Sequence, residues 1–583
     1  MSKLAVKEII CRHPVPKYPH YHAKIEVRND TNDTYYIDKL IANKEGVRDY
    51  VIYCGGDFIF EPILKPNATS YIYARVDWEV NSKVDIEFDL VEEVSESNTQ
   101  ISLSASTPSY GGYWNKDWNY YFSVIATDRY GLERVNEPIH ISTTVYFDQI
   151  KDPKKEVRVV EVDAITGAQK EIPSQVYGVA PPYTGEVNIS IEHSLSFEVA
   201  FFANVRKNEG KVYLVFYGND KAVQPNYPSK LSVTGSAPGL VIENEYYKIS
   251  MHKSSGVIFD IETKMGVNKT LAHGLETNGS VHWNPGFYAP PKAWTHTSDW
   301  DPAPNHTVEY GPIFLMTQAN GPLPLYEDQT DVSQTYVFYA ENPYIRSSSI
   351  IDIKVDAHVQ AVRNGEIVFN HDIITNFAYR DKLDEIKHMV ITELPRFEEV
   401  ALTYDTDAPW VAFYNPEDRF GFAELTINLA KMRREGGLPR VEHHNQYLNW
   451  GPWSYSTRCM IFPFTSQNPQ RMCYAPKSST YYEDIVFMPF LVREDLDKYE
   501  QFKDVDQAYE VHENPLYIQV DHKTDKRVPA QFVLGPRLEG EIKETEDKPW
   551  PITLDSNYTR FRQSPVILNE MNFIEKDGKY YYR

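Results

Sequence analysis

Alternation of apolar and polar residues over short segments is the feature that most constrains the fold of this chain. Residues 240–267, LVIENEYYKISMHKSSGVIFDIETKMGV, alternate in this way on both sides of a Ser-Ser-Gly turn, as the two strands of a β-hairpin do. Similar runs follow one another along most of the sequence. The 42 Tyr residues strengthen the pattern, because Tyr, Val, Ile and Thr favour strands. We therefore expect an all-β fold.

Helical periodicity is scarce. The best candidates are DKLDEIKH, residues 381–388, and VREDLDKYEQFKDVDQAYEV, residues 492–511.

The length of 583 residues predicts several domains, about three or four, because one hydrophobic core rarely grows that large. Residues 1–105 read as an immunoglobulin-like β-sandwich module, followed by a Ser/Thr/Gly-rich linker. Residues 113–232 form a second, small β domain. Residues 239–520 contain many long antiparallel strands and predict a large two-sheet sandwich, which we take as the catalytic domain. Residues 521–583 are charged and Pro-rich and read as a tail packed on that sandwich.

A formal net charge of -23 argues against nucleic acid and anionic membrane surfaces as partners. No apolar run is long enough to span a bilayer, and the first residues lack the apolar core of a signal peptide. We expect a cytoplasmic protein as the sequence stands, or a periplasmic or secreted one if a leader has been removed. The four cysteines show no metal-binding spacing; Cys459 and Cys473 either bridge a hairpin or remain free thiols.

A basic island stands out in this acidic chain at residues 431–455, KMRREGGLPRVEHHNQYLNWGPWSY. Its cations can hold an anionic group, its imidazoles and phenols can move protons, and its indoles can stack on sugar faces. The alternative is ordinary packing around a turn. The candidate catalytic residues of the island are Arg434, Arg440, His443, His444 and Tyr447, and its candidate sugar platforms are Trp450 and Trp453.

A second stretch, residues 281–312, is a long loop rich in His, Trp and Pro, and such loops are often functional. The alternative is a stiff loop whose indoles plug one end of the sandwich. Its candidate substrate-binding residues are His282, Asn284, Trp294, His296 and Trp300. A divalent cation held by side chains such as His296, Asp299, Asp301 and His306 is possible in principle, but their spacing matches no compact motif, so no metal site is assigned.

A third stretch, residues 363–381, places His371 in a strand-like context between Asn370 and Asp372. We include His371 among the candidate catalytic residues, although a lone strand histidine is more often a satisfied structural residue.

Two reactions fit these residues. β-Elimination on a uronic acid needs a cation on the carboxylate, a base for the C5 proton and an acid for the leaving oxygen, which Arg434 or Arg440, His443 or His444, and Tyr447 can supply. Glycoside hydrolysis needs two carboxylates roughly 5–10 Å apart. With 82 acidic residues in the chain, that requirement is easily met by chance. The candidate carboxylates are Asp299, Asp301, Asp372, Glu424 and Glu442.

Two segments resemble known families. The R-V-N-E-P run at 134–138, the E-I-P-S-Q run at 171–175 and the strand ending Y-L-V-F-Y-G-N at 213–219 are similar to the small β-barrel domain of YetA-like and exo-acting rhamnogalacturonan lyase proteins. The stretch 240–261 resembles the opening of galactose-mutarotase-like super-sandwich domains. The resemblance covers roughly residues 128–430.

This resemblance implies a multidomain all-β chain with an N-terminal β-sandwich, a small β-barrel and a large antiparallel super-sandwich of the galactose-mutarotase-like kind. It implies a carbohydrate-active enzyme and most plausibly a polysaccharide lyase. The chain departs from those exo-lyases because nothing after residue 430 has the helical periodicity of their C-terminal α/α toroid, and because an extra β module comes first. Individual catalytic residues of the family do not map onto this chain.

From the sequence we expect a polysaccharide or oligosaccharide lyase that cleaves an acidic, uronate-containing glycan by β-elimination. The alternatives are a glycoside hydrolase using paired carboxylates on the same scaffold and a non-catalytic carbohydrate-binding protein. The expected partner is an oligo- or polysaccharide, and a homo-oligomer is compatible with the sequence.

Overall fold

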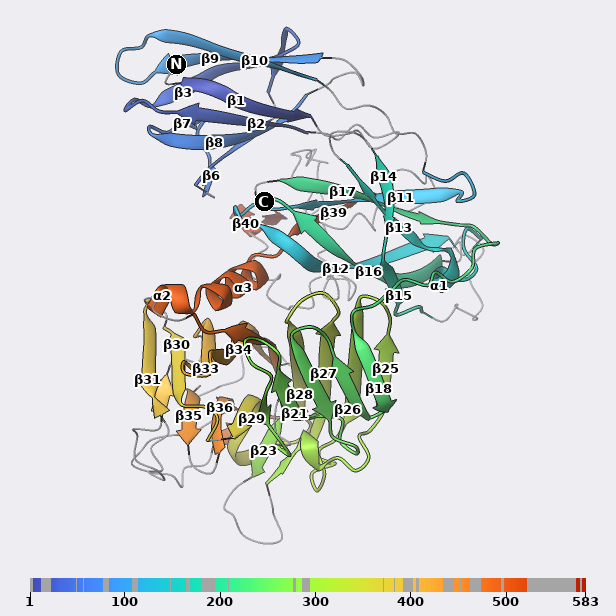
Figure 1. Cartoon of the computed structure of the whole chain (residues 1–583). Helices are drawn as coiled ribbons and strands as arrows, with labels where there is room; N and C mark the ends of the chain where they lie inside the picture. Colours follow the sequence, from blue (N-terminus) through green and yellow to red (C-terminus); the bar gives the residue numbers. More distant parts are fainter. Residues whose placement is uncertain are drawn as a thin grey trace. The chain divides into compact units, whose positions relative to one another are not determined.

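The structure is a computed structural model of the chain and divides into two compact units, residues 1–227 with 514–548 and residues 228–513 with 549–583. It describes all residues except 1–3, 12–21, 49, 56, 77–82, 107–113, 147, 164–167, 181–193, 208, 276–278, 286–293, 371, 382, 392–401, 405–407, 434–444, 451–452, 462–472, 494–497, 522–572, 577–578 and 583. Strands dominate both units (Figure 1), so the predicted all-β class is confirmed.

The first unit begins with a β-sandwich of two sheets. One sheet has the order β1 (Leu4–Cys11), β2 (His22–Asn29), β8 (Ala68–Arg75), β5 (Tyr50–Cys54) and β6 (Asp57–Ile59). The other has the order β10 (Asn98–Ser106), β9 (Lys83–Glu92), β3 (Tyr35–Ala42) and β4 (Glu45–Val47), with β7 (Ile63–Leu64) also on β3.

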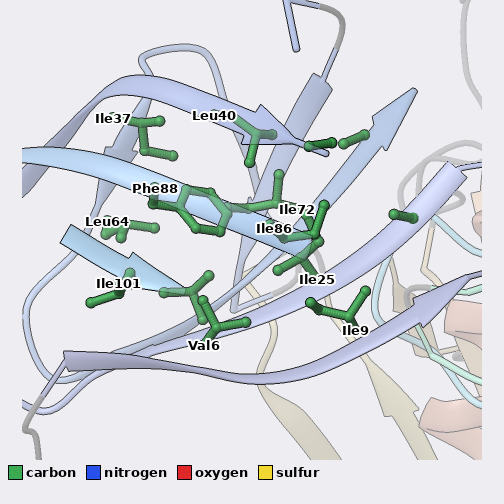
Figure 2. Close-up of a cluster of buried hydrophobic side chains, with 14 of the residues drawn as sticks. Val6, Ile9, Ile25, Ile37, Leu40, Leu64, Ile72, Ile86, Phe88 and Ile101 are labelled. Atoms are coloured by element: carbon green, nitrogen blue, oxygen red, sulfur yellow. The ribbon is translucent and has the colours of Figure 1, made fainter. Parts of the chain in front are cut away.

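Alternation along the strands builds the core of this sandwich (Figure 2). Every second residue of β9 from Val84 to Leu90 is buried, and Phe88 lies at the centre of the cluster with no exposed surface. In β3 the register shifts between Ile37 and Lys39, and Leu40 is again buried beyond the shift. The alternating pattern of the sequence therefore predicts the N-terminal sandwich correctly.

The second part of the unit contains two more sheets and the short helix α1 (Pro153–Glu156). The five-stranded sheet has the order β14 (Gln169–Ile172), β13 (Arg158–Val162), β17 (Gly210–Tyr217), β11 (Tyr120–Thr127) and β39 (Tyr517–Asp521). The three-stranded sheet has the order β12 (Arg134–Tyr146), β16 (Ser194–Val205) and β15 (Ser174–Tyr177). Among the described strands no ladder joins these sheets, so the expected small β-barrel is a pair of open sheets instead.

The R-V-N-E-P run holds the chain where it returns to form β39. The Arg134 guanidinium is fully buried, pairs with Asp128 at 2.9 Å and Glu137 at 3.0 Å, and donates to the carbonyl of Asn514 at 2.6 Å. Glu137 accepts the backbone N–H of Leu516 at 3.2 Å. This contact explains why β39, which follows the large sandwich in sequence, pairs with β11.

The described residues of the second unit include sheets of five, seven and nine strands. The five-stranded sheet has the order β18 (Ser232–Ser236), β19 (Gly239–Glu243), β20 (Tyr247–Met251), β21 (Ile258–Thr263) and β22 (Lys269–Ala272). The seven-stranded sheet has the order β24 (Thr295–His296), β23 (His282–Pro285), β29 (Ala357–Asn370), β36 (Trp453–Ile461), β35 (Asn445–Trp450) and β32 (Leu402–Tyr404), with β37 (Cys473–Ala475) on β29.

The nine-stranded sheet faces the seven-stranded sheet across a shared core, as the predicted two-sheet sandwich requires. Its order is β25 (Thr307–Tyr310), β26 (Phe314–Gly321), β27 (Thr330–Tyr339), β28 (Ile345–Ile353), β38 (Ser479–Leu491), β34 (Phe420–Arg433), β33 (Trp410–Asn415), β30 (Asn376–Arg380) and β31 (Ile386–Val390). The Phe369 ring of one sheet lies 5.2 Å from Phe413 and 5.5 Å from Phe422 of the other. A hairpin of β40 (Phe573–Lys576) and β41 (Lys579–Tyr582) is also described.

One of the two helix predictions is confirmed. Helices α2 (Lys498–Gln501) and α3 (Lys503–Glu513) fall in the stretch 492–511 and just beyond it, and Phe502 and Val505 pack against Trp410 of the nine-stranded sheet. The prediction of a helix at 381–388 is wrong. There the Asp381 carboxylate accepts the N–H groups of Leu383 and Glu385 and closes a turn between β30 and β31. Within the described part of the chain, none of the helices is both long and apolar enough to cross a bilayer.

Candidate functional site

The two stretches singled out in the sequence contribute strands to one sheet. Strand β23 carries His282 and comes from the loop 281–312, whereas β35 and β36 come from the island 431–455. Strand β29 lies between β23 and β36. Neighbouring strands are about 4.8 Å apart, so β23 and β36 run roughly 10 Å from each other.

Strand β29 bulges where it passes these neighbours. Asn364 pairs with Arg458 and Ile367 with Ser456, so two residues of β29, Gly365 and Glu366, oppose one residue of β36. A bulge changes the direction in which the following side chains point. In this strand it brings Arg363 and Glu366 to the same imidazole, that of His282.

The His282 imidazole is buried between a guanidinium and a carboxylate. Arg363 Nη2 donates to its Nδ1 at 3.0 Å, and Glu366 Oε2 lies 3.6 Å from its Nε2. A guanidinium only donates, so the proton of the neutral ring is on Nε2. Burial, followed by repulsion from Arg363 and His296, holds the pKa of His282 well below its ordinary value. The ring is therefore neutral at pH 7.

A second imidazole and an exposed indole adjoin the first. The ring of His296 lies 5.1 Å from that of His282, and the two residues pair directly between β23 and β24. His296 Nδ1 hydrogen-bonds to Ser298 Oγ and lies 3.5 Å from Asp299, whose other oxygen accepts the His296 N–H at 3.1 Å. Trp294 is 43% exposed, and the Arg363 guanidinium lies 5.9 Å from its ring centroid.

These residues form the His282 cluster, which we define as Arg363, Glu366, His282, His296, Asp299 and Trp294. Two imidazoles stand between a buried carboxylate, Glu366, and an exposed one, Asp299. Such a set can donate and accept hydrogen bonds and can transfer protons, and the exposed indole offers an apolar face.

A second group of charged residues lies inside the sandwich, in what we call the buried ion layer. The Arg458 guanidinium has no exposed surface, forms an ion pair with Glu483, lies 3.2 Å from Glu424 and donates to Thr426 Oγ1 at 2.7 Å. Burial raises the pKa of Glu424 to about 8 and outweighs the attraction to Arg458, which lowers it; burial also raises the pKa of Glu483. Glu424 therefore cannot reach a substrate as the sequence analysis allowed.

Other candidates of the sequence analysis are placed as follows. Trp300 is 3% exposed, its indole donates to the carbonyl of Pro322 at 2.8 Å, and it packs in the core, so we leave it out of the site. Asp301 and Asp372 are exposed residues outside the cluster. The structure describes only the backbone of Asn284, Tyr447, Trp450 and Trp453. Outside the described residues lie His371, Arg434, Arg440, Glu442, His443 and His444.

Arg363 and Glu366 were not predicted as site residues from the sequence. Both lie in the stretch 363–381 singled out above, but strict alternation would place residues three apart on opposite faces. Only the bulge at Gly365 brings both side chains to His282. The available signal in the sequence was Gly365 itself, since a glycine inside a strand often marks a bulge, and in the structure its φ is positive.

The described residues do not support the divalent cation considered above. Among them, no three His, Cys, Asp or Glu side chains are grouped closely enough to hold a metal ion.

No protein-family model and no curated protein sequence matches this chain. Similar solved structures include a glycosyl hydrolase family 38 protein from Enterococcus faecalis, with 10% identity over 71% of this chain and 49% of that one at a TM-score of 0.43. An α-mannosidase from E. faecalis V583 shows 12% identity over 70% and 46%, with a TM-score of 0.43. A galactose mutarotase related enzyme from Lactobacillus acidophilus shows 10% identity over 44% and 99%, with a TM-score of 0.26.

The chain spans about half the length of the first two of these proteins. TM-scores this low carry no conclusion about the function of this chain.

Proposed function

We propose that this protein is a carbohydrate-active enzyme that hydrolyses glycosidic bonds, with the His282 cluster as its sugar site. The observation that carries the proposal is the placement of Asp299 and Glu366 at the two ends of an imidazole pair, beside an exposed indole. Glycoside hydrolysis uses two carboxyl groups, one to protonate the leaving oxygen and one to activate water or attack the sugar.

The two carboxylates differ in their surroundings, which suits such a division of roles. Asp299 is exposed and close to His296, so it can contact water and substrate directly. Glu366 is buried against Arg363 and His282, so it does not contact a substrate itself and takes part in proton transfer only through the imidazole pair. Different environments are the usual means by which one site assigns different proton roles to two carboxyl groups.

The remaining residues suit sugar binding. Trp294 presents an indole face on which the apolar side of a pyranose can stack. The half-buried His296, beside the buried His282, can exchange hydrogen bonds with sugar hydroxyl groups. A neutral sugar is the better fit, because the Arg363 charge is already compensated by Glu366.

β-Elimination on a uronate remains a second candidate, in line with the resemblance of residues 128–430 to rhamnogalacturonan-lyase-like proteins. The observation that favours it is the Arg363 guanidinium beside the exposed Trp294, where it could meet a sugar carboxylate. The island residues Arg434, Arg440, His443, His444 and Tyr447 would take the roles of carboxylate ligand, base and acid.

Incubation of the protein with separate panels of neutral and uronate-containing oligosaccharides distinguishes these reactions. Hydrolysis releases reducing ends without ultraviolet absorbance, whereas β-elimination forms an unsaturated uronate that absorbs. We expect reducing ends without absorbance. Products that absorb ultraviolet light would indicate a lyase. Glycan binding without turnover would indicate a sugar-binding protein without catalytic activity.

A further inference from the structure

The bulge in β29 touches two different groups of side chains within four residues. Arg363 and Glu366 contact His282 in the cluster described above. Between them, Asn364 and Gly365 contact side chains in the interior of the sandwich. The bulge therefore physically joins the His282 cluster to the buried ion layer.

Glu483 packs directly on the backbone of the bulge. A Cβ atom at Gly365 would lie 2.7 Å from both carboxylate oxygens of Glu483, a distance that real Cβ atoms do not reach. Gly365 also has a φ of +53°, which favours glycine. The absence of a side chain at residue 365 therefore lets the carboxylate fill the space behind the bulge.

The Glu483 carboxylate has little freedom to move away. It is paired with Arg458, which is itself fixed by Glu424 and Thr426, and all three charged groups are almost completely buried. Removing one member of such a group leaves an uncompensated charge in the core.

The backbone on both sides of Gly365 is anchored as well. Thr457 Oγ1 donates to the carbonyl of Asn364 at 3.2 Å, and the Asn364 side chain donates to Ser349 Oγ at 2.7 Å. The Gly279 N–H donates to the carbonyl of Glu366 at 2.6 Å. A shift of Glu483 would thus be transmitted to the neighbouring peptide groups rather than absorbed by a loose segment.

We propose that Glu483 and Arg458 are positioning residues for the His282 cluster: Glu483 packs against Gly365, Arg458 holds Glu483 there, and together they set the bulge that presents Arg363 and Glu366 to His282. This proposal rests on the proposed function for its consequence in catalysis. It assigns a role in the site to charged side chains that never touch the substrate.

Gly365→Ala tests the contact, and Gly274→Ala is its matched control. Gly274 also has a positive φ, of +67°, but a Cβ added there meets only a Phe259 ring carbon at an ordinary 3.7 Å. Both substitutions carry a similar backbone cost, whereas only the first displaces Glu483. Glu483→Gln keeps the shape of the side chain and removes its charge, and it serves as the second variant if Gly365→Ala does not fold.

The first readout is the pair of ring nitrogen resonances of His282 in full-length protein with ¹⁵N-labelled histidine, assigned by their loss in His282→Asn. We expect Gly365→Ala and Glu483→Gln to shift these resonances and Gly274→Ala to leave them unchanged. A folded Glu483→Gln or Gly365→Ala protein with unchanged His282 resonances would overturn the proposal.

The second readout is hydrolysis of the oligosaccharide that the wild type cleaves. We expect kcat to fall on the order of 10²-fold in Gly365→Ala with a smaller change in KM, as for a misplaced catalytic group. An equal change in the Gly274→Ala control would also count against the proposal. If the wild type cleaves no glycan, the proposed function fails, while the resonances of His282 still decide the positioning role.

Discussion

Glu424 illustrates how a single buried residue can make the stability of the whole protein depend on pH. It shares the Arg458 guanidinium with Glu483, and none of the three side chains is more than 2% exposed. Two ionised carboxylates and one guanidinium would leave a net negative charge in the core. Retention of one proton avoids this cost, which agrees with the raised pKa of Glu424.

The free energy of unfolding should fall as the pH rises. The pKa of the Glu424 carboxyl rises from 4.5 to about 8 on folding, so between these values the folded state keeps a proton that the unfolded state has lost. The stabilising effect is complete below about pH 4.5 and is lost as the pH rises through 8, on the order of 1 kcal/mol per pH unit. Urea unfolding between pH 5 and about 8 should show this decline in the wild type and a flatter profile in Glu424→Gln. Parallel profiles would contradict the assignment of the proton to this pair.

Trp294 is the residue whose substitution should affect substrate binding more than chemistry. Trp294→Ala removes the exposed indole, and loss of about 1 kcal/mol of stacking should raise KM roughly fivefold with little change in kcat. Steady-state kinetics check this, with Tyr310→Ala as the control, because Tyr310 is a comparably exposed aromatic residue on β25. A similar KM in the two variants would remove Trp294 from the site.

Among the elements, β39 depends on a buried ionic contact rather than on its own sequence. Arg134 holds the carbonyl of Asn514 and the carboxylates of Asp128 and Glu137, and Glu137 in turn holds Leu516. The R-V-N-E-P run thus has a structural role: it fixes the point at which the chain returns to pair with β11.

Arg134→Ala should therefore destabilise the first unit. Removing the guanidinium leaves two carboxylates buried without their cation, a change that typically costs about 3–5 kcal/mol. Urea unfolding measures the loss, and hydrogen exchange should show β39 losing protection. Arg28→Ala is the control, because Arg28 forms an exposed ion pair with Asp30 and its removal should have a much smaller effect.

The alternation of apolar and polar residues predicted the strands well. The wrong or missing predictions each have a physical reason. The hairpin β20–β21 and the strand β9 follow directly from period-two patterns. The stretch 381–388 was wrongly predicted as a helix, because the turn that the Asp381 carboxylate makes there leaves no periodic signal in the sequence. Pairing between distant segments, such as β11 with β39, depends on a buried contact that short-range patterns do not contain.

For the molecule as a whole, the division into two units predicts separable unfolding. Val520 in the first unit and Val486 in the second are both almost completely buried, so Val→Ala at either site should cost roughly 2 kcal/mol. Calorimetry of the full-length protein should show that Val520→Ala lowers one transition and Val486→Ala the other. If each substitution shifts a single common transition, the two units unfold together.

The candidate site was only partly predictable from sequence. The loop 281–312 and the strand 363–381 were singled out for their residue types, and His282, Trp294, His296 and Asp299 of the cluster came from that loop. The sequence could not predict Arg363 and Glu366, because their meeting at His282 depends on a bulge. Nor could it tell that Glu424 and Trp300 point into the core.

The central claim is that the His282 cluster is the hydrolytic site, and the most direct test is the rate of reducing-end release by Asp299→Asn. Asp331→Asn is the matched control, because Asp331 is a comparably exposed aspartate paired with Lys354 on the other sheet. We expect Asp299→Asn to lower kcat on the order of 10²-fold or more without loss of stability, and Asp331→Asn to retain wild-type activity. Undiminished release of reducing ends by a folded Asp299→Asn protein would place the chemistry elsewhere in the molecule.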